Sequence, residues 1–437
     1  MWQSRVKLQF VAAFQWFSVV SVANCHGLSG HCCAMPIPFS FAKNSNSGTP
    51  SMFDLPKIFT KHTASIAAVG LVCAMSTAHA GNLENEYPEL SRLYNAFDVA
   101  QAQLFDLMVE INADSSTKIA QDRLAIALDT MANMTIGDMI DAGLNYGDAQ
   151  IVMDSPYAAL ETQARIKLAQ HVSRVHSLED ATSAFAKSPA LTPIAAAVIG
   201  RGRALEREIY DIFTDQSNTI VAKRAQVDQA VERYLSDEEL AVASEPKMVA
   251  LYLSGDYTNG LKAAFPKFSA LMWSNQWLQL ASLEAIVLGQ VDPQFANEID
   301  TTLERYRNKL GSETGMTMFP APTEMPTVPA IAPSLYSQSP AAAVIIDNLN
   351  MLEVAVANII AYPNLANRAQ ALDEAVRAYT DKEYGIAVSE DYLLSALRGG
   401  IFNQGGPAIG ALDQSERNRS RIGMDMQKSL RMSTPNH

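Results

Sequence analysis

Apolar residues in this chain recur at alternating spacings of three and four, and this periodicity constrains the fold more than any other feature of the sequence. Because an α-helix turns once every 3.6 residues, such spacing places the side chains on one stripe of a helix. Three series follow it: Leu90, Leu93, Phe97, Ala100, Leu104, Leu107, Ile111; Ile345, Leu349, Leu352, Val356, Ile359; and Leu365, Ala369, Leu372, Val376, Tyr379. Patterns typical of β-strands are nearly absent, so the sequence predicts an all-α fold.

An amphipathic helix is stable in water only when its apolar stripe faces another apolar surface. Seams spaced by three and four are typical of helices packed side by side at shallow angles. Short connections between such neighbours make antiparallel hairpins. We therefore predict antiparallel helical hairpins arranged as a multi-helix bundle or a short α-solenoid.

The sequence also contains an internal repeat, in which residues 195–255 align with residues 341–399 at an offset of about 145 positions. Both segments carry a capping-box pattern, at 236–239 and 380–383, where a third helix is expected to begin. The competing explanation is that Ala-rich amphipathic helices resemble one another by composition. Among the matches are Ala195-Ala196-Ala197-Val198-Ile199 with Ala341-Ala342-Ala343-Val344-Ile345, Arg224-Ala225-Gln226 with Arg368-Ala369-Gln370, and Tyr234 with Tyr379.

A targeting signal precedes the helical part of the chain. Lys57 and Lys61 are followed by an apolar run over 64–75 and then by Ser-Thr-Ala-His-Ala at 76–80, with small residues three and one positions before Gly81. This order is typical of a secretory signal peptide, and the apolar run is too short to span a bilayer comfortably. We predict that residues 52–80 are removed on export and that no transmembrane segment remains.

The role of residues 1–51 is open. They are either an upstream extension that is not translated, with Met52 as the true start, or an outer targeting segment for an organelle lumen. The first interpretation places the protein in the bacterial periplasm or outside the cell. All four cysteines lie before Gly81, so the exported chain has no thiol for disulfides, nucleophilic catalysis or metal binding: Cys25, Cys32, Cys33 and Cys73.

Composition shifts predict the organisation of the exported chain. We expect an N-terminal helical domain over 81–190, a middle helical domain over 191–314, and C-terminal helical hairpins over 341–400. Between the last two, residues 315–340 hold six prolines and three methionines, which predicts a linker or an ordered loop. Residues 401–437 form a Gly-rich and polar tail.

The charge of the chain excludes one class of partner. The first 80 residues hold five Lys or Arg and one Asp, which leaves 28 basic and 45 acidic residues and a net charge of −17 in the exported part. A surface this acidic repels phosphate backbones, so we expect no nucleic-acid partner.

Residues that carry catalysis are scarce. Beyond the signal the only histidines are His171, His176 and His437, and the first two, five apart, do not share a helix face. No Glu-x-x-His or His-Glu-x-x-His motif occurs. We therefore expect a protein that is not an enzyme and needs no cofactor, with a carboxylate-dependent hydrolase as an alternative. Gly200 and Gly202 lie inside a helical pattern, where we expect them to permit close helix packing.

Two methionine clusters suggest a metal-binding alternative. Met316 and Met318 lie in the proline-rich segment, and Met424 and Met426 lie in the tail. Soft thioether ligands select a soft ion, so these four residues are candidate ligands for Cu(I) in a periplasmic copper-handling protein. The competing explanation is that methionine fills irregular gaps between helices.

Trp273 and Trp277 are the only tryptophans after the signal, and their spacing of four places them on one helix face. Aromatic shelves of this kind bind partner side chains, although a core helix explains them equally. Together these patterns predict an exported helical-repeat protein with a binding, structural or assembly role in the cell envelope, with a protein as its expected partner.

Overall fold

The chain folds into helices wherever the computed structural model describes it, over residues 81–133, 157–254, 256–311 and 325–402. Within these ranges no β-strand occurs, and the only β-type pairing is an isolated antiparallel bridge between Lys247 and Ile386. The all-α prediction is therefore confirmed. The helices are α3 (Asn82–Glu86), α4 (Pro88–Ala113), η2 (Ser115–Thr117), α5 (Lys118–Asn133), α8 (Ala158–Ser173), α9 (Leu178–Lys187), α10 (Pro193–Thr214), α11 (Ile220–Leu235), α12 (Ala250–Leu253), α13 (Gly260–Ala264), α14 (Pro266–Val291), η3 (Pro293–Phe295), α15 (Glu298–Gly311), α16 (Val328–Ile331), α17 (Pro333–Gln338), α18 (Pro340–Ala361), α19 (Arg368–Thr380) and α20 (Ser389–Phe402).

The predicted apolar seams face the interior. All seven residues of the first series are buried on α4, and all five of the second are buried on α18. The third series is correct only for Leu372, Val376 and Tyr379, which are buried on α19. Ala369 is exposed and Leu365 precedes the helix, because α19 begins only at Arg368.

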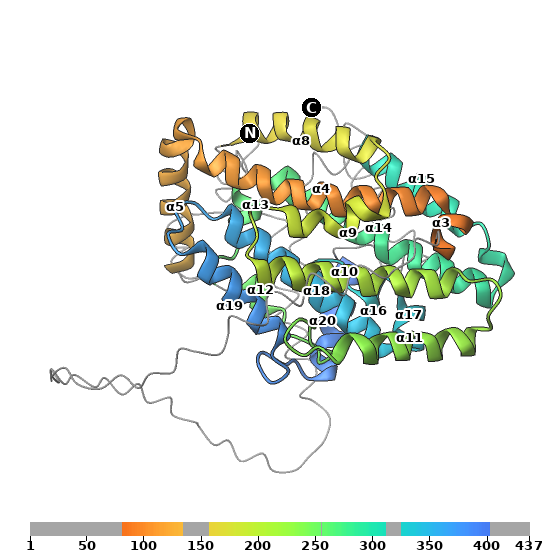
Figure 1. Ribbon diagram of the computed structural model, residues 1–437. Helices are drawn as coiled ribbons and strands as arrows, with labels where there is room; N and C mark the ends of the chain where they lie inside the picture. Colours follow the sequence, from red (N-terminus) through yellow and green to blue (C-terminus); the bar gives the residue numbers. More distant parts are fainter. Residues whose placement is uncertain (1–80, 134–156, 255, 312–324, 403–437) are drawn as a thin grey trace, which may run out of the picture. The chain divides into compact units, whose positions relative to one another are not determined.

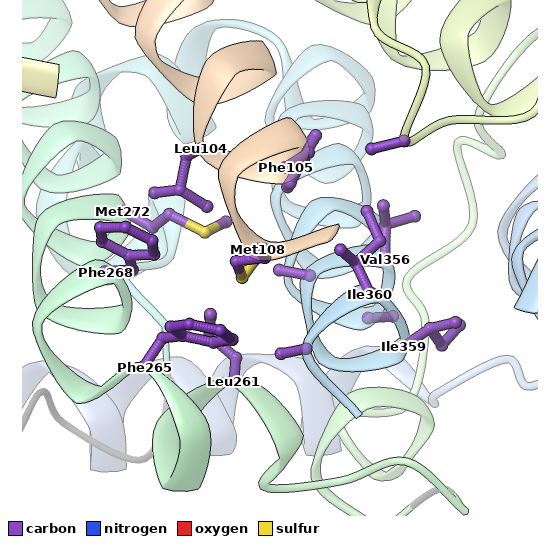
Figure 2. Close-up of a cluster of buried hydrophobic side chains, with 14 of the residues drawn as sticks. Leu104, Phe105, Met108, Leu261, Phe265, Phe268, Met272, Val356, Ile359 and Ile360 are labelled. Carbon is purple, nitrogen blue, oxygen red and sulfur yellow. The ribbon is translucent and has the colours of Figure 1, made fainter. Parts of the chain in front are cut away.

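Three long helices, α4, α14 and α18, share one part of the core (Figure 2). Met108 of α4 lies between Phe268 and Met272 on the α14 side and Val356 and Ile360 on the α18 side. Full burial of each such side chain contributes about 1.5–3 kcal/mol to the free energy of unfolding. Figure 1 shows that α4, α9, α10 and α11 lie alongside one another in that order, each in contact with the next.

Helix α18 is the most apolar of the described helices, and it alone among them is long and apolar enough to cross a membrane. Its apolar window is 94% buried within the protein, and the core helix of a soluble protein passes the same test of length and composition. Helix α10 packs against it closely at Gly202, where an added Cβ would lie 2.7 Å from the Leu349 side chain. The prediction of close helix packing is confirmed at Gly202 and is wrong at Gly200, where no atom of another element lies within 4 Å of an added Cβ.

Side chains from all three predicted helical domains contribute to the same two hydrophobic clusters. The described helices belong to one compact unit, Thr77–His437. The signal at 52–80 and the preceding residues 1–51 lie outside the described residues, as does the tail from residue 403.

Two local predictions are wrong. The pattern at 236–239 does not begin a helix, because Ser236 is the C-cap of α11, and no helix begins at 380–383 either. The third helices start later, at Ala250 and Ser389. Capping boxes are therefore weak evidence for the repeat. A capping box does occur at Ser177, before α9.

The proline-rich segment is also more ordered than a linker where the structure describes it. From Met325 onward it contains α16 and α17, and Val328, Ile331 and Leu335 are fully buried among the other helices. Proline is compatible with these short helices because it occupies one of their first two positions, where the backbone N–H has no helical partner.

Candidate functional site

A pocket between the α12–α13 region, α14 and α18 is the strongest candidate binding site in the described part of the chain. It encloses about 60 Å³, which accommodates about four to six water molecules at roughly 10–15 Å³ each. Its lining combines apolar, aromatic and polar side chains, among them Tyr252, Lys262, Met272, Trp273, Gln276 and Asn358. A few polar groups in an apolar pocket are typical of small-molecule sites.

The short helix α13 is fixed against α18 by two close contacts. Asn259 adopts a left-handed conformation with φ of 67° and turns the chain into Gly260. An added Cβ on Gly260 would lie 2.6 Å from the carbonyl oxygen of Asn358. The Asn358 side-chain oxygen also accepts a hydrogen bond from the Leu261 N–H at 3.0 Å, so the next residue, Lys262, is held at the pocket.

Gln276 provides a buried polar group at this pocket. Its side chain is 1% exposed, and its Nε2 donates to the carbonyl oxygen of Asn350 at 3.5 Å. Within the described residues its Oε1 has no hydrogen-bond partner, and neither has the buried Oγ1 of Thr258 on the same pocket. A buried oxygen without a partner costs about 1–3 kcal/mol. Both atoms are buried beneath the pocket surface, so they mark polar groups in its wall and not contacts open to an occupant.

The remaining walls set the character of the pocket. Trp273, Met272 and Met325 are apolar surfaces, and the Met325 N–H donates to the Tyr252 hydroxyl at 3.3 Å. Lys262 is the cation on the lining, and burial lowers its pKa from the ordinary value because desolvation disfavours the ammonium form. An anionic occupant would stabilise that ammonium form.

A second polar cluster, the Arg203 network, lies at the crossing of α10, α14 and α18. Arg203 Nη1 donates to Glu206 at 2.6 Å and to Gln279 Oε1 at 3.1 Å, and its Nε donates to Glu353 at 2.8 Å. All three charged side chains are at most 5% exposed. Desolvation lowers the pKa of the Arg203 guanidinium, but the nearby Glu353 and Glu206 carboxylates outweigh it, and the net shift is upward.

This network continues toward α4 through hydroxyl and guanidinium groups. Tyr210 donates to the backbone carbonyl of Gln279 at 2.6 Å, and Tyr94 shares a hydrogen bond with Ser282. Arg207 donates to Asp98 of α4 at 2.9 Å. Burial raises the pKa of both tyrosines, which keeps them neutral. Because each group bonds to another helix, the network holds α4, α10, α14 and α18 together.

Three buried carboxyl groups have pKa values raised to about 7, which is unusual and often marks catalytic residues. Here each one accepts hydrogen bonds from the first turn of another helix. Glu161 accepts from Lys267 and Phe268 of α14 at 2.8 and 2.9 Å. Glu284 accepts from Ser334 of α17 at 2.9 Å.

Asp347 is the third of these carboxyl groups. It accepts from the Val328 N–H of α16 at 2.8 Å and from the Tyr392 hydroxyl at 2.6 Å. Burial is the main cause of all three raised pKa values, and the hydrogen bonds partly offset it. None of the three helices has a side-chain cap from its own N-cap residue, so the carboxyl groups act as caps supplied by distant helices.

The candidate residues from the sequence are distributed as follows. Trp273 and Trp277 are 8% and 4% exposed on α14 and lie in a hydrophobic cluster, and Trp273 also lines the pocket. Their burial fits the core explanation, and partner binding through them stays a prediction. The candidate copper ligands Met316, Met318, Met424 and Met426 lie outside the described residues.

The two histidines are closer than their spacing predicted. Helix α8 ends at Ser173, so the chain leaves the helix before His176 and folds back. The imidazole rings of His171 and His176 stack with centroids 5.9 Å apart. The prediction that they do not share a helix face assumed one helix through both residues, and this assumption is wrong because His176 lies beyond the end of α8. Within the described ranges no group of three or more His, Cys, Asp or Glu residues is placed to hold a metal ion.

The sequence matches no protein-family profile, no curated protein and no solved structure. The pocket residues Lys262 and Gln276 carry no motif that sequence reasoning can detect. The one available signal is the aromatic enrichment around Trp273, which lies on the same helix as Gln276 and close to the pocket.

Proposed function

We propose that this chain is an exported helical protein of the cell envelope whose role is binding rather than catalysis. The observation that supports this most directly is the α13–α14–α18 pocket, whose lining combines apolar, aromatic and polar side chains. A pocket of about 60 Å³ lies far below the roughly 300–1,000 Å³ of typical small-molecule sites, so it suits only a ligand of a few atoms or the tip of a larger one.

The use of the buried charges favours binding over carboxylate-dependent hydrolysis. Glu161, Glu284 and Asp347 each cap another helix, and Glu206 and Glu353 share Arg203. Groups committed to structural hydrogen bonds are poorly placed to transfer protons to a substrate. The carboxyl groups of the interior therefore fit a structural role.

We infer export from the leader that ends at Ala80, and the fold offers support at the residue that follows it. Gly81 lies against the Asp211 carboxylate, where an added Cβ would approach Oδ1 to 2.5 Å. The adjoining Leu83 N–H donates to that oxygen at 3.0 Å. A side chain at this position would need only a shift of the flexible Asp211 side chain, so the contact supports an ordered start at Gly81 without requiring a glycine there.

We also propose that the two hairpins α10–α11 and α18–α19 are copies of one unit, as the sequence repeat predicts. Helices α10 and α18 are both 22 residues long and both begin with proline. Each helix is followed by a second helix that packs against it, α11 after α10 and α19 after α18, which is the order expected of two copies of one hairpin.

Export and binding have separate tests. Expression of the full chain in a Gram-negative host, followed by fractionation and mass spectrometry, should give a periplasmic form that begins at Gly81. A cytosolic form that retains residues 64–75 would contradict export. Binding is tested by a screen of small polar molecules against the processed protein with thermal unfolding as the readout. If no compound raises the unfolding temperature or changes the fluorescence of Trp273, binding at this pocket is refuted.

A further inference from the structure

We propose that residues 417–432, in the tail of this chain, dock onto an exposed apolar surface beside the turn between α19 and α20. This surface, the α19–α20 patch, consists of Met248, Tyr384, Ile386, Val388 and Leu394. The interaction lies within one chain and does not involve the α13–α14–α18 pocket. It therefore goes beyond the proposed binding function, and either proposal can fail without the other.

Large exposed apolar side chains concentrate at the α19–α20 patch. Twelve are exposed across the described residues, and five of them lie here, each between 43% and 62% exposed. The other seven are spread over α5, α8, α9, α11, α14 and the turn between α8 and α9. Single apolar side chains on a surface need no explanation, but a group of this size marks an interaction site.

Hydrogen bonds hold the two segments of the patch together. The Met248 N–H donates to the carbonyl oxygen of Gly385 at 2.8 Å, and Lys247 pairs with Ile386 in the isolated β-bridge. The buried Lys247 ammonium also donates to the carbonyl oxygen of Tyr384 at 2.6 Å. These contacts fix the turn on the segment before α12, so the patch is one preformed surface and not two separate loops.

Carboxylates surround the patch. Six exposed acidic side chains lie within residues 236–249 and 381–394: Glu238, Glu239, Asp381, Glu383, Glu390 and Asp391. Lys382 is the one exposed basic residue of these two ranges, and it already pairs with Glu238 at 2.8 Å. An apolar surface with an acidic rim favours an occupant that combines apolar and basic side chains.

Residues 417–432 have this composition. They hold five basic side chains and one acidic side chain, interleaved with five apolar side chains. The basic residues are Arg417, Arg419, Arg421, Lys428 and Arg431, and the apolar residues are Ile422, Met424, Met426, Leu430 and Met432. Methionine adapts to irregular apolar surfaces, so docking gives this methionine cluster a role that needs no metal.

The connection to the patch is short enough for docking within one chain. The structure describes the chain to Phe402, the last residue of α20, and the same helix carries Leu394. The connecting residues 403–416 can span about 50 Å, whereas α20 is about 21 Å long. A covalent connection of this length gives an effective concentration on the order of 1 mM, so even a weak contact forms within the chain.

Photo-crosslinking in the purified protein tests this docking. A benzoylphenylalanine at position 426 should cross-link, within a single chain, to residues 246–248 or 384–394, as mapped by mass spectrometry. Replacing Ile386 and Val388 with serine should lower this yield at least about threefold, because it removes apolar contact area. Val221→Ser is the matched control, since Val221 is an exposed apolar residue in the first turn of α11 outside the patch, and it should leave the yield unchanged.

The charge of the tail is tested separately. Replacing Arg417, Arg419 and Arg421 with glutamate should lower the yield at least about tenfold at low salt, because like charges then face the acidic rim. In the unreplaced chain the yield should fall as NaCl is raised to about 1 M, where the Debye length is about 3 Å. Met424→Leu keeps an apolar side chain and should leave the yield unchanged.

Hydrogen exchange supplies a second measurement on the patch itself. Backbone amides of residues 384–388 should exchange at least about twofold more slowly in the wild type than in the charge-reversed variant, because the docked tail covers them. Circular dichroism of each variant establishes that it is folded. Equal exchange, cross-links scattered over other surfaces, or a yield unaffected by the patch and charge substitutions overturns the proposal. Cross-links between two chains, recognised by the doubled mass, assign the patch to a second copy and overturn docking by the tail.

Discussion

Removal of the proposed signal peptide before Gly81 should create an ion pair that the uncleaved chain cannot form. In the full chain the backbone of Gly81 continues toward Ala80, and the Asp211 carboxylate lies beside the unfilled Cβ position, which is 2.5 and 2.6 Å from its two oxygens. Cleavage before Gly81 leaves a free α-ammonium group. A rotation of about 120° around the Cα–C bond, which a terminal glycine allows freely, carries that nitrogen into the vacant Cβ position beside both oxygens.

The expected gain in the free energy of unfolding is the balance of attractive and opposing electrostatic effects. A unit charge pair at about 2.8 Å has a gross attraction of about 6 kcal/mol at an effective dielectric constant of 20. Asp211 is half-buried, so desolvation of both groups removes most of this attraction. A positive charge at the start of α3 also opposes the helix dipole by about 0.3–1 kcal/mol. Charge-assisted hydrogen bonds contribute about 1.5–3 kcal/mol, so the net stabilisation should be about 1–2 kcal/mol.

A double-mutant cycle isolates this contribution. The processed protein with a free Gly81 amine and the same protein with an acetylated amine are each compared with their Asp211→Asn versions by urea unfolding near neutral pH. We expect a coupling energy of about 1–2 kcal/mol. The pairing raises the pKa of the α-amino group, so the contribution is complete below its unfolded value of about 8 and is lost as the pH rises through the folded value.

Asp211 also accepts the Leu83 N–H, and the Asp211→Asn change alone weakens this contact in both forms, so it cancels in the cycle. A coupling energy below about 0.3 kcal/mol would refute the ion pair. A coupling that persists above the folded pKa of the amine would refute its electrostatic origin.

Three further predictions concern the core and the methionine clusters. Arg203→Met should lower the free energy of unfolding in urea by about 3–5 kcal/mol, because it leaves two buried carboxylates unpaired. Adding Glu206→Gln and Glu353→Gln should restore at least half of the lost stability. A loss below about 1 kcal/mol in the single variant would contradict this role of Arg203. The pKa of Asp347 is raised to about 7 in the folded state, so its contribution to stability is complete at low pH and declines as the pH rises from about 4 to 7. Relative to Asp347→Asn, the wild-type free energy of unfolding should therefore fall by about 2–3 kcal/mol between about pH 5 and 8, and parallel pH profiles would refute the assignment. The copper alternative predicts that the processed protein binds Cu(I) more tightly than micromolar and that the affinity is lost when four methionines are replaced by leucine: Met316, Met318, Met424 and Met426. Binding weaker than micromolar, or an affinity that the leucine substitutions leave unchanged, would refute the copper alternative.

Local periodicity was enough to predict the helices and the faces they bury. The seams on α4 and α18 are correct at every position, because an apolar stripe must be buried wherever the helix packs. The close packing at Gly202 was predicted from its place in a helix interior, but the same argument fails at Gly200, where an added Cβ would meet open space. The partner of Gly202, Leu349, was not predictable, because helix pairing depends on contacts about 150 residues apart.

Tertiary structure alone decided where the polar groups of the interior act. Asp347 and Glu284 lie within apolar helices, and nothing in their neighbourhood indicates that they cap α16 and α17. The pocket likewise joins Lys262, Gln276 and Asn358 from three helices. Amphipathic spacing specifies which side of a helix turns inward, but a hydrogen bond requires two atoms within about 3 Å, and only the packing of distant segments sets that distance.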